Sequence, residues 1–442
     1  MPVSPARAAA FDILLRVEGE KAYASDLLHA PSQAKLSAAD HRLTTELVMG
    51  TLRWRSVLDR QIEKHASQPL EKLDVEVLIA LRLATYQLLF LSRVPERAAV
   101  HESVELVKRA RKRSAVSFVN AVLRKLAGCK AAEMPAISQA GDAAALAGRS
   151  AHPQWLVQRW EREFGLTAAR QICEYDQQSP ETSVRLNAVE AEGELLRDGI
   201  VLAPGRLLAS ARRLQSGDIT KTKAFAERRV TIQDEASQLV ALLVGHGTRI
   251  LDCCAAPGGK TRMLARQNPE AQITAVELHP HRAHLLRELV PEKNVQVVAA
   301  DVRQLPLAGR FDRVLADVPC SGTGTLARNP DIKWRLKLDD IADLQQRQSA
   351  ILRAAMQYVA PGGRLVYSTC SLEREENQEV VEQALAAEPA FRVRDCHQEL
   401  ERLQAEGELT NPDLDSLLSG PYLRTIPGAQ PCDGFFAAVL ER

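Results

Sequence analysis

One glycine-rich turn, three carboxylates and a thiol stand at the ends of predicted strands in the second half of the sequence. The turn covers residues 254–260 and reads Cys254-Ala255-Ala256-Pro257-Gly258-Gly259-Lys260. The acids are Glu277, Asp301 and Asp317, and the thiol is Cys370. Ligands of open α/β sheets bind outside the carboxyl ends of the strands. We therefore expect these groups to share one edge of a sheet, named here the carboxyl edge.

The turn suits S-adenosylmethionine better than a phosphate ligand. The dinucleotide pattern G-x-G-x-x-G is absent. A phosphate-binding loop would need glycine at position 254, where this sequence has Cys254. Because Gly259-Lys260-Thr261 matches the end of that loop, a nucleotide triphosphatase is an alternative. S-adenosylmethionine has no phosphate to cradle. Glu277 follows Gly259 by slightly less than the roughly 20 residues that precede the ribose-binding acid in dinucleotide folds. Glu277 is thus predicted to bind the ribose, and Asp301 the adenine amine.

A second thiol, in Asp317-Val318-Pro319-Cys320, indicates the methyl acceptor. Methyltransferases that act on amino groups tend to have an aromatic residue here, so a thiol favours methylation of carbon. Carbon 5 of cytosine is a poor nucleophile, and a thiolate that adds to carbon 6 turns it into an enamine that can accept a methyl group. Asp317 is placed to assist the addition at ring nitrogen 3. From this chemistry alone, either Cys320 or Cys370 could be the nucleophile.

The elements that must position these groups alternate between strand and helix from about residue 245. Predicted strands cover residues 249–254, 273–278, 295–301, 311–317 and 364–369, and residues 435–440 form a last apolar strand. This alternation favours a doubly wound parallel sheet. We expect residues 241–442 to form a Rossmann-like α/β methyltransferase domain.

The first part of the chain is predicted to be helical. Apolar residues follow helical spacing through residues 1–128, and residues 77–91 are apolar nearly all round, which predicts a central buried helix. Residues 129–150 are rich in alanine and glycine and are predicted as a linker. Residues 151–240 are predicted as a small α+β unit, with a helix to about 177 and strands at 182–187 and 206–214.

Basic residues concentrate in the helical region. Residues 93–125 contain nine Lys and Arg residues against three glutamates, in a chain whose formal net charge is +1. The centre of this basic cluster is formed by Lys108, Arg109, Arg111, Lys112 and Arg113. Such a run is either a polyanion-binding surface or the solvated end of a helix.

Several of these stretches resemble known families. Phe118-Val119-Asn120-Ala121-Val122-Leu123-Arg124, with residues 8–14 and 46–50, resembles the NusB fold, a helical RNA-binding module. Residues 252–261, 317–324, 329–334, 367–371, 375–377 and 433–436 resemble the motifs of RNA cytosine-5 methyltransferases. Taken together, the chain resembles the bacterial 16S ribosomal RNA cytosine-5 methyltransferases of the RsmB (Sun) type.

The resemblance implies a role for each group. Cys370 would be the nucleophile, Cys320 would assist release, and Asp317 would contact the base. Residues 254–260, Glu277, Asp301 and Asp317 would hold S-adenosylmethionine, and Lys260 would also face the cytosine. The basic helical domain and the small α+β unit would bind ribosomal RNA. Two alternatives are a cytosine-5 methyltransferase that acts on another RNA and a catalytically inactive RNA-binding assembly factor.

The composition excludes other classes of protein. Apolar residues make up 45% and charged residues 26% of the 442 residues, which is ordinary for globular proteins. Residues 77–91 are too short and too polar to span a bilayer. The eight cysteines lack the spacing of a disulfide framework or a zinc site. We expect a monomeric cytoplasmic enzyme that binds no metal and no membrane.

Overall fold

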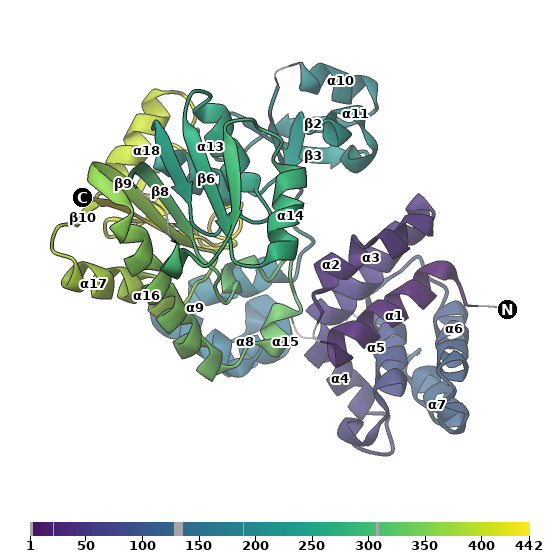
Figure 1. Ribbon diagram of the computed structural model, residues 1–442. Coiled ribbons are helices and arrows are strands. Elements are labelled where there is room, and N and C mark those ends of the chain that lie inside the picture. Colours follow the sequence, from purple (N-terminus) through teal and green to yellow (C-terminus); the bar gives the residue numbers. More distant parts are fainter. Residues whose placement is uncertain (1–2, 21, 128–135, 189, 306–308) are drawn as a thin grey trace. The chain divides into compact units, whose positions relative to one another are not determined.

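The computed structural model describes residues 3–20, 22–127, 136–188, 190–305 and 309–442. They form two compact units. The helical unit comprises Met1–Ser179 and Leu326–Arg335, and the sheet unit comprises Pro180–Thr325 and Leu336–Arg442. Each unit has apolar cores of its own. Figure 1 shows the helices of the first unit and the sheets of the second.

Helix α5 (Val75–Phe90) is the centre of the helical unit. Its buried residues lie on all sides of the helix, and it contacts α1, α3, α4, α6 and α7. This arrangement confirms the central buried helix predicted from residues 77–91. The other helices of the unit are α1 (Pro5–Gly19), α2 (Ala24–Leu28), α3 (Ala38–Arg53), α4 (Arg55–Glu63), α6 (Glu96–Arg109), α7 (Val116–Leu126), α8 (Ala143–Ser150), α9 (Gln154–Asp176) and α15 (Ile332–Arg335).

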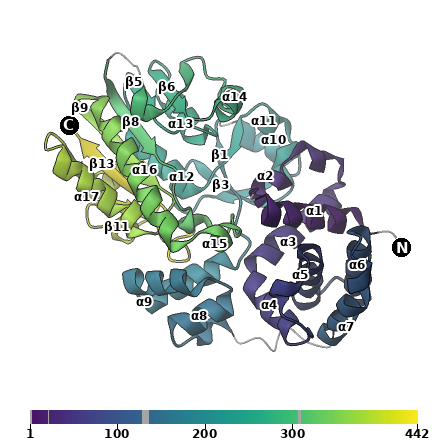
Figure 2. The same cartoon turned by 60° about the horizontal axis from the view of Figure 1, so that its bottom comes forward.

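Helices α8 and α9 pack side by side in the helical unit (Figure 2). Residues 143–150 fall in the predicted linker but form α8, because the Asp142 side chain caps the helix by accepting the Ala145 N–H and because Leu146 is buried. Helix α9 belongs to the helical unit by its contacts. The part of the predicted linker at 129–135 lies outside the described residues.

A short segment from the later part of the sequence completes the helical unit. Leu326–Arg335 groups with it. Lys333 Nζ donates to the carbonyl of Arg53 at 3.0 Å, and Trp334 Nε1 donates to that of Leu52 at 2.6 Å. The last carbonyls of a helix have no partner within the helix. Lys333 and Trp334 therefore cap the carboxyl end of α3, which is why this segment lies here.

The sheet unit begins with a small antiparallel sheet whose strands lie in the order β2-β3-β1-β4. Its elements are β1 (Ser183–Leu186), α10 (Ala191–Arg197), β2 (Val201–Pro204), β3 (Ala211–Ser216), α11 (Lys223–Ala226) and β4 (Val230–Ile232). The strand predicted at 206–214 starts later, at Ala211. The reason is that the N–H groups of residues 206–208 donate to the carboxylate of Glu235 and not to a neighbouring strand.

The large sheet has the strand order β7-β6-β5-β8-β9-β13-β12-β11, with β10 paired to β13. The strands β5 to β9 run parallel, as predicted. Strand β13 runs antiparallel to β9, so the sheet is mixed and not wholly parallel. Its bounds are β5 (Arg249–Asp252), β6 (Gln272–Glu277), β7 (Val295–Ala299), β8 (Phe311–Asp317), β9 (Val359–Thr369), β10 (Arg392–Arg394), β11 (Leu418–Ser419), β12 (Tyr422–Arg424) and β13 (Phe436–Glu441).

Helices cover both faces of the large sheet. Residues that alternate along the strands enter two different cores, as Ile250 and Leu251 do. One core includes residues of α12 and α18, and the other includes residues of α16 and α17. The helices are α12 (Glu235–Val244), α13 (Gly259–Gln267), α14 (Pro280–Leu289), α16 (Leu338–Gln357), α17 (Gln378–Ala387) and α18 (Cys396–Ala405).

Candidate active site

The carboxyl edge of the large sheet has a topological switch point between β5 and β8. After β5 the chain adds β6 and β7 on one side, and it then adds β8 and β9 on the other. Ligands of open α/β sheets bind at such a point. The turn at 254–260 follows β5 and the Asp317–Cys320 stretch follows β8, so the predicted site residues of both segments lie at this point.

The turn after β5 is held by backbone and side-chain contacts. Cys253 N–H donates to β8 and Ala255 N–H donates to β6. Gly258 has φ +114°, and a Cβ atom there would lie 2.5 Å from Val290 Cγ2, so only glycine fits this position. Thr261 Oγ1 donates to Asp252 at 2.7 Å, and burial raises the pKa of Asp252 to about 6.

Lys260 and Asp317 form an ion pair across the switch point. Lys260 Nζ lies 2.7 Å from Asp317 Oδ2, and Asp317 Oδ1 accepts a hydrogen bond from Ser368 Oγ at 2.8 Å. The ammonium group also lies 5.1 Å from the ring centroid of Phe435. Because β13 is antiparallel to β9, the segment before it brings this ring to the carboxyl edge. No local pattern in the sequence indicated that Phe435 or Ser368 lies beside these groups.

Cys320 and Cys370 lie next to each other. They follow β8 and β9, and their Sγ atoms are 3.3 Å apart. The hydrogen bond with Cys370, together with burial, raises the pKa of the Cys320 thiol. Cys320 therefore keeps its proton at neutral pH, and its S–H can donate toward Cys370.

The two predicted cofactor acids stand farther along the carboxyl edge. Glu277 is 4% exposed, and its Oε1 accepts the N–H of His279 at 2.9 Å. Asp301 forms an ion pair with Arg303 at 2.6 Å. The hydrogen bonds that Arg303 donates to this carboxylate lower the pKa of Asp301. Burial and the charges of Asp252, Asp317 and Glu277 raise the pKa of the Cys254 thiol. Cys254 is thus a protonated thiol in the wall of the site.

A buried network behind the two thiols includes residues to which the sequence assigned no role. Glu376 is fully buried and accepts a hydrogen bond from Ser321 N at 2.8 Å. Asn377 is held by Thr369 and donates to the Ser371 carbonyl at 2.9 Å. The contact between Ser321 and Glu376 joins segments that are far apart in the sequence, so local spacing carries no signal for it. The signal in the sequence that indicated this region is that Glu376 and Asn377 belong to a motif, residues 375–377, that resembles one of the RNA cytosine-5 methyltransferases.

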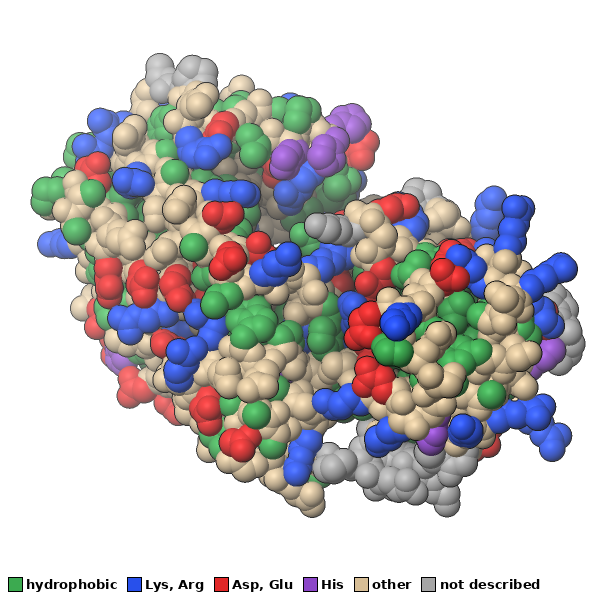
Figure 3. Space-filling model, turned by 90° about the horizontal axis from the view of Figure 1, so that it is seen from below, with side chains coloured by type: hydrophobic (Ala, Val, Ile, Leu, Met, Phe, Trp, Pro, Cys, Tyr) green, Lys and Arg blue, Asp and Glu red, His purple; other side chains and the backbone are tan. Residues whose placement is uncertain are grey.

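The basic cluster in the helical unit is partly neutralised. Three of the five predicted RNA-binding residues form ion pairs, namely Lys108 with Glu105 (2.7 Å), Arg109 with Asp12 (2.7 Å) and Lys112 with Asp74 (3.2 Å). Arg111 and Arg113 are exposed. Figure 3 shows Lys and Arg side chains interspersed with Asp and Glu side chains on the face in view. The positive charge that the cluster can offer to RNA is therefore smaller than the number of its basic residues suggests.

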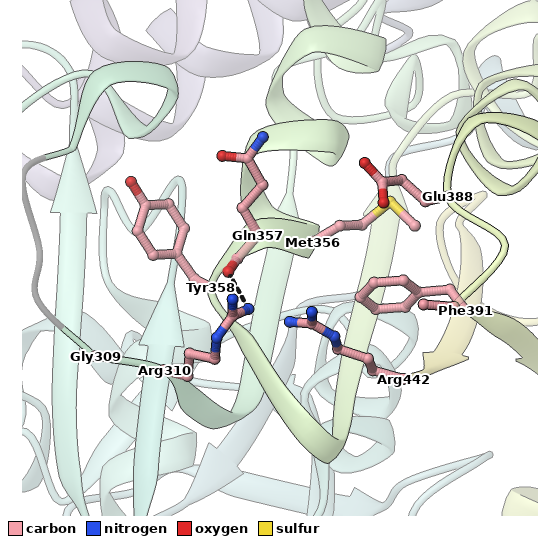
Figure 4. Close-up of a pocket in the computed structure, with 9 residues that line it drawn as sticks. Gly309, Arg310, Met356, Gln357, Tyr358, Glu388, Phe391 and Arg442 are labelled. Carbon is pink, nitrogen blue, oxygen red and sulfur yellow. Dashed lines mark hydrogen bonds between the residues drawn. The ribbon is translucent and has the colours of Figure 1, made fainter.

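A cavity of about 490 Å³ lies at the opposite edge of the large sheet, near the start of β8 and β9 (Figure 4). Two arginines line it, but both bind backbone carbonyls. Arg310 Nη1 donates to Gln357 O at 2.7 Å, and Arg442 Nη1 donates to Val359 O at 2.6 Å. These arginines fasten the ends of strands, and the cavity is remote from the thiols.

The residues that the structure describes contain neither a cluster of metal ligands nor a helix that could span a membrane. In those ranges, no group of three or more His, Cys, Asp or Glu side chains is placed to hold a metal ion. No helix within the described part of the chain is both long and apolar enough to cross a bilayer.

Three family models match successive parts of the chain. The NusB family matches residues 4–128, and the RsmF/B-like ferredoxin-like domain matches residues 152–205. The 16S rRNA methyltransferase RsmB/F family matches residues 239–441. These matches follow the order of a helical domain, a small α+β unit and a methyltransferase domain, and they confirm the predicted fold class.

Curated relatives match over the full length. The Bacillus subtilis protein named "Probable ribosomal RNA small subunit methyltransferase B" is 36% identical over 100% of both chains. The Vibrio cholerae "Ribosomal RNA small subunit methyltransferase B" is 32% identical and covers 99% of this chain and 97% of its own.

Solved structures share the fold. The structure of PH0851 has a TM-score of 0.80 at 24% identity and covers 100% of both chains. The structure of NSun6 from Pyrococcus horikoshii with SFG, an S-adenosylmethionine analogue, has a TM-score of 0.55 at 19% identity and covers 65% of this chain and 98% of its own. On the full-length matches to the curated relatives, the chain belongs to the RsmB/F family of S-adenosylmethionine-dependent ribosomal RNA methyltransferases.

Proposed function

We propose that this protein transfers a methyl group from S-adenosylmethionine to carbon 5 of a cytosine in 16S ribosomal RNA, through a covalent adduct with Cys370. The observation that carries the proposal is the pair of thiols 3.3 Å apart, Cys320 and Cys370. The Lys260–Asp317 ion pair stands on the neighbouring strand ends. A second thiol has no use in direct methylation of an amino group, whereas covalent catalysis needs both addition and release.

The residues at the carboxyl edge fit S-adenosylmethionine. Glu277 is buried, and its Oε2 lies 3.9 Å from Arg282 Nη1, too far for a hydrogen bond, so it can accept hydrogen bonds from a ribose diol. Asp301 offers acceptors for an adenine amine. The turn at 254–260 has the Cys254 thiol where a phosphate-binding loop needs a glycine, which argues against a triphosphate ligand. When bound, S-adenosylmethionine supplies an electrophilic methyl group.

Each protein group has one part in the reaction. The Cys370 sulfur forms a bond to carbon 6 as the double bond between carbons 5 and 6 opens, and ring nitrogen 3 takes a proton that Asp317 relays from the Lys260 ammonium group. Lys260 holds the Asp317 carboxylate and faces the base. After methyl transfer, a water molecule takes the proton from carbon 5, the double bond between carbons 5 and 6 forms again, and the bond between carbon 6 and sulfur breaks to release Cys370 as a thiolate. Cys320, beside the leaving sulfur, assists this release.

The RNA must present an unstacked cytosine. A base inside a helix cannot reach a thiol at the edge of a sheet, so the target nucleotide leaves its stack. Phosphate contacts supply affinity, and the shape of the folded RNA supplies most of the selection. The exposed residues Arg111 and Arg113 are our candidates for backbone contacts, with weaker contributions from the three paired members of the basic cluster.

The test compares the two cysteine variants. Cys370→Ala cannot form the adduct, so it should neither methylate RNA nor become linked to it. Cys320→Ala can add and methylate but should stall at release, and the linked RNA would migrate as a slow band on a denaturing gel. Bisulfite mapping of 16S ribosomal RNA made with the wild-type protein identifies the cytosine. An adduct in Cys370→Ala and none in Cys320→Ala would exchange the two roles, and methylation at nitrogen would end the proposal.

A further inference from the structure

The carboxylate of Glu376 is buried beside the two thiols, where neutral groups donate hydrogen bonds to both of its oxygens. It is 0% exposed. Its Oε1 accepts hydrogen bonds from Ser321 N and from Gln348 Nε2, both at 2.8 Å. Its Oε2 accepts hydrogen bonds from the hydroxyl groups of Ser321 and Ser371. Burial of a charged group is costly unless hydrogen bonds from the protein replace those from water. The donors around Glu376 are therefore arranged to hold a carboxylate at this position.

The two serines identify what Glu376 holds. Ser321 follows Cys320 in the chain, and Ser371 follows Cys370. The two hydroxyl groups also lie 3.0 Å from each other. One carboxylate therefore binds the residues next to both thiols, although these residues are 50 positions apart in the sequence.

Gln348 fixes the other side of Cys320. Its Nε2 donates to the carbonyl of Pro319 at 3.0 Å and to Glu376 at 2.8 Å. The peptide groups before and after Cys320 are thus both tied to one buried pair of side chains. The negative charge of Glu376 also contributes to the raised pKa of Cys320, after the hydrogen bond with Cys370, burial and the charge of Cys370.

We propose that Glu376 is a positioning residue that sets the distance between Cys320 and Cys370. The proposal rests on the proposed function only in that the two thiols act on one base. Glu376 is too deeply buried to touch RNA, so its effect on the reaction passes through the thiols.

Two substitutions separate the hydrogen bonds of Glu376 from its charge. In Glu376→Gln, the amide oxygen can still accept from Ser321 N and Gln348, while the amide nitrogen faces two hydroxyl groups that can turn to accept. This variant therefore keeps the connection and removes the charge. Glu376→Ala removes both. Glu379→Gln is the matched control, because Glu379 is a partly exposed glutamate on the next helix that pairs with Arg374.

The first measurement is disulfide trapping without RNA or cofactor. A mild thiol oxidant such as diamide takes two electrons and two protons from the pair and forms the Cys320–Cys370 bond at a rate that reports their proximity. Glu376→Ala should slow trapping by about tenfold or more, the factor expected from losing one or two hydrogen bonds that hold the loops. Glu376→Gln and Glu379→Gln should stay close to the wild-type rate. Unchanged trapping in a folded Glu376→Ala variant would overturn the positioning role. If that variant does not fold, Ser321→Ala combined with Ser371→Ala replaces it, with the same expectation.

The second measurement is the pH dependence of alkylation at Cys320, made in a Cys370→Ser background. Glu376→Gln should move the midpoint of iodoacetamide labelling to lower pH, and Glu379→Gln should not. An equal midpoint in Glu376→Gln and the parent protein would overturn the charge effect. Both measurements are independent of methyl transfer. A wild-type protein that fails to methylate cytosine would refute the proposed function and leave this inference standing.

Discussion

Gly324→Ala tests whether the site depends on a close contact between two backbone segments. Gly324 lies shortly after Cys320, and its N–H donates to the Cys370 carbonyl at 2.9 Å. Its own carbonyl accepts the N–H of Gly434 at 2.8 Å. A Cβ atom at 324 would lie 2.1 Å from Gly434 O and 2.7 Å from Gly434 C. Both neighbours are backbone, so no side chain can rotate away.

The size of the effect follows from these distances. Ordinary contact begins near 3.4 Å, so the Gly434 carbonyl or the Gly324 backbone must move by more than an ångström. Such overpacking costs about 1–3 kcal/mol of folding free energy. A displacement of about 1 Å at a reacting group costs about 100-fold in rate, and here the moved backbone holds the Cys370 carbonyl. We expect a loss of methyl transfer far larger than the loss of stability alone would produce.

Single-turnover methyl transfer and equilibrium unfolding measure the two effects. Gly193→Ala is the control, because its Cβ atom meets nothing within 4 Å. It lies in α10, where alanine should stabilise the helix by up to about 1 kcal/mol. A tenfold loss of rate corresponds to about 1.4 kcal/mol of activation free energy. If the methyl-transfer rate of Gly324→Ala stays within about twofold of wild type, the backbone contact does not position the thiols.

Three further predictions concern the cofactor, the RNA and pH. Glu277→Ala should weaken S-adenosylmethionine binding by roughly 1–3 kcal/mol, the range for hydrogen bonds to a charged group, and equal affinity by calorimetry would remove Glu277 from the site. Replacing Arg111 and Arg113 by glutamine should each lower the salt slope of RNA binding by about 1, whereas Lys108→Gln should lower it less, and a larger effect of Lys108 would contradict the ion pairing. Asp252 has a folded-state pKa of about 6, above its ordinary 3.8, so its contribution to stability is present below about pH 4 and is lost as pH rises through about 6. The free energy of unfolding of Asp252→Asn should lack this decline. If that free energy changes with pH in the same way for both proteins from about pH 4 to about pH 7, the raised pKa of Asp252 is refuted.

The sequence predicted the elements whose patterns are local. The strand at 311–317 has the bounds of β8, and the helix at 77–91 matches α5 closely, because continuous apolar runs reflect burial on every side. The carboxyl edge was also predictable, since parallel strands end together and the residue after each strand can be read directly. That reasoning placed Cys320 and Cys370 on one edge, where their sulfur atoms lie 3.3 Å apart.

The differences arise where distant segments decide the structure. The late start of β3 depends on Glu235, which comes later in the chain, beyond strand β4. The pairing of Arg109 with Asp12 spans 97 residues, so a count of nearby charges could not reveal it. The network around Glu376 and the contact between Gly324 and Gly434 likewise join segments that no periodicity connects.

The placement of Leu326–Arg335 has a consequence for how the chain folds as it is made. The carboxyl end of α3 is capped by Lys333 and Trp334, yet the whole stretch from Pro180 to Thr325 is synthesised between Ser179 and this segment. At roughly 5–20 residues per second, a stretch of roughly 150 residues takes roughly 8–30 s to synthesise. During that interval the helical unit has emerged without its last segment, so the Leu52 carbonyl lacks its Trp334 donor and the Arg53 carbonyl has Gln177 but not Lys333. The first part of the protein to be synthesised is therefore completed only after most of the parallel strands have left the ribosome.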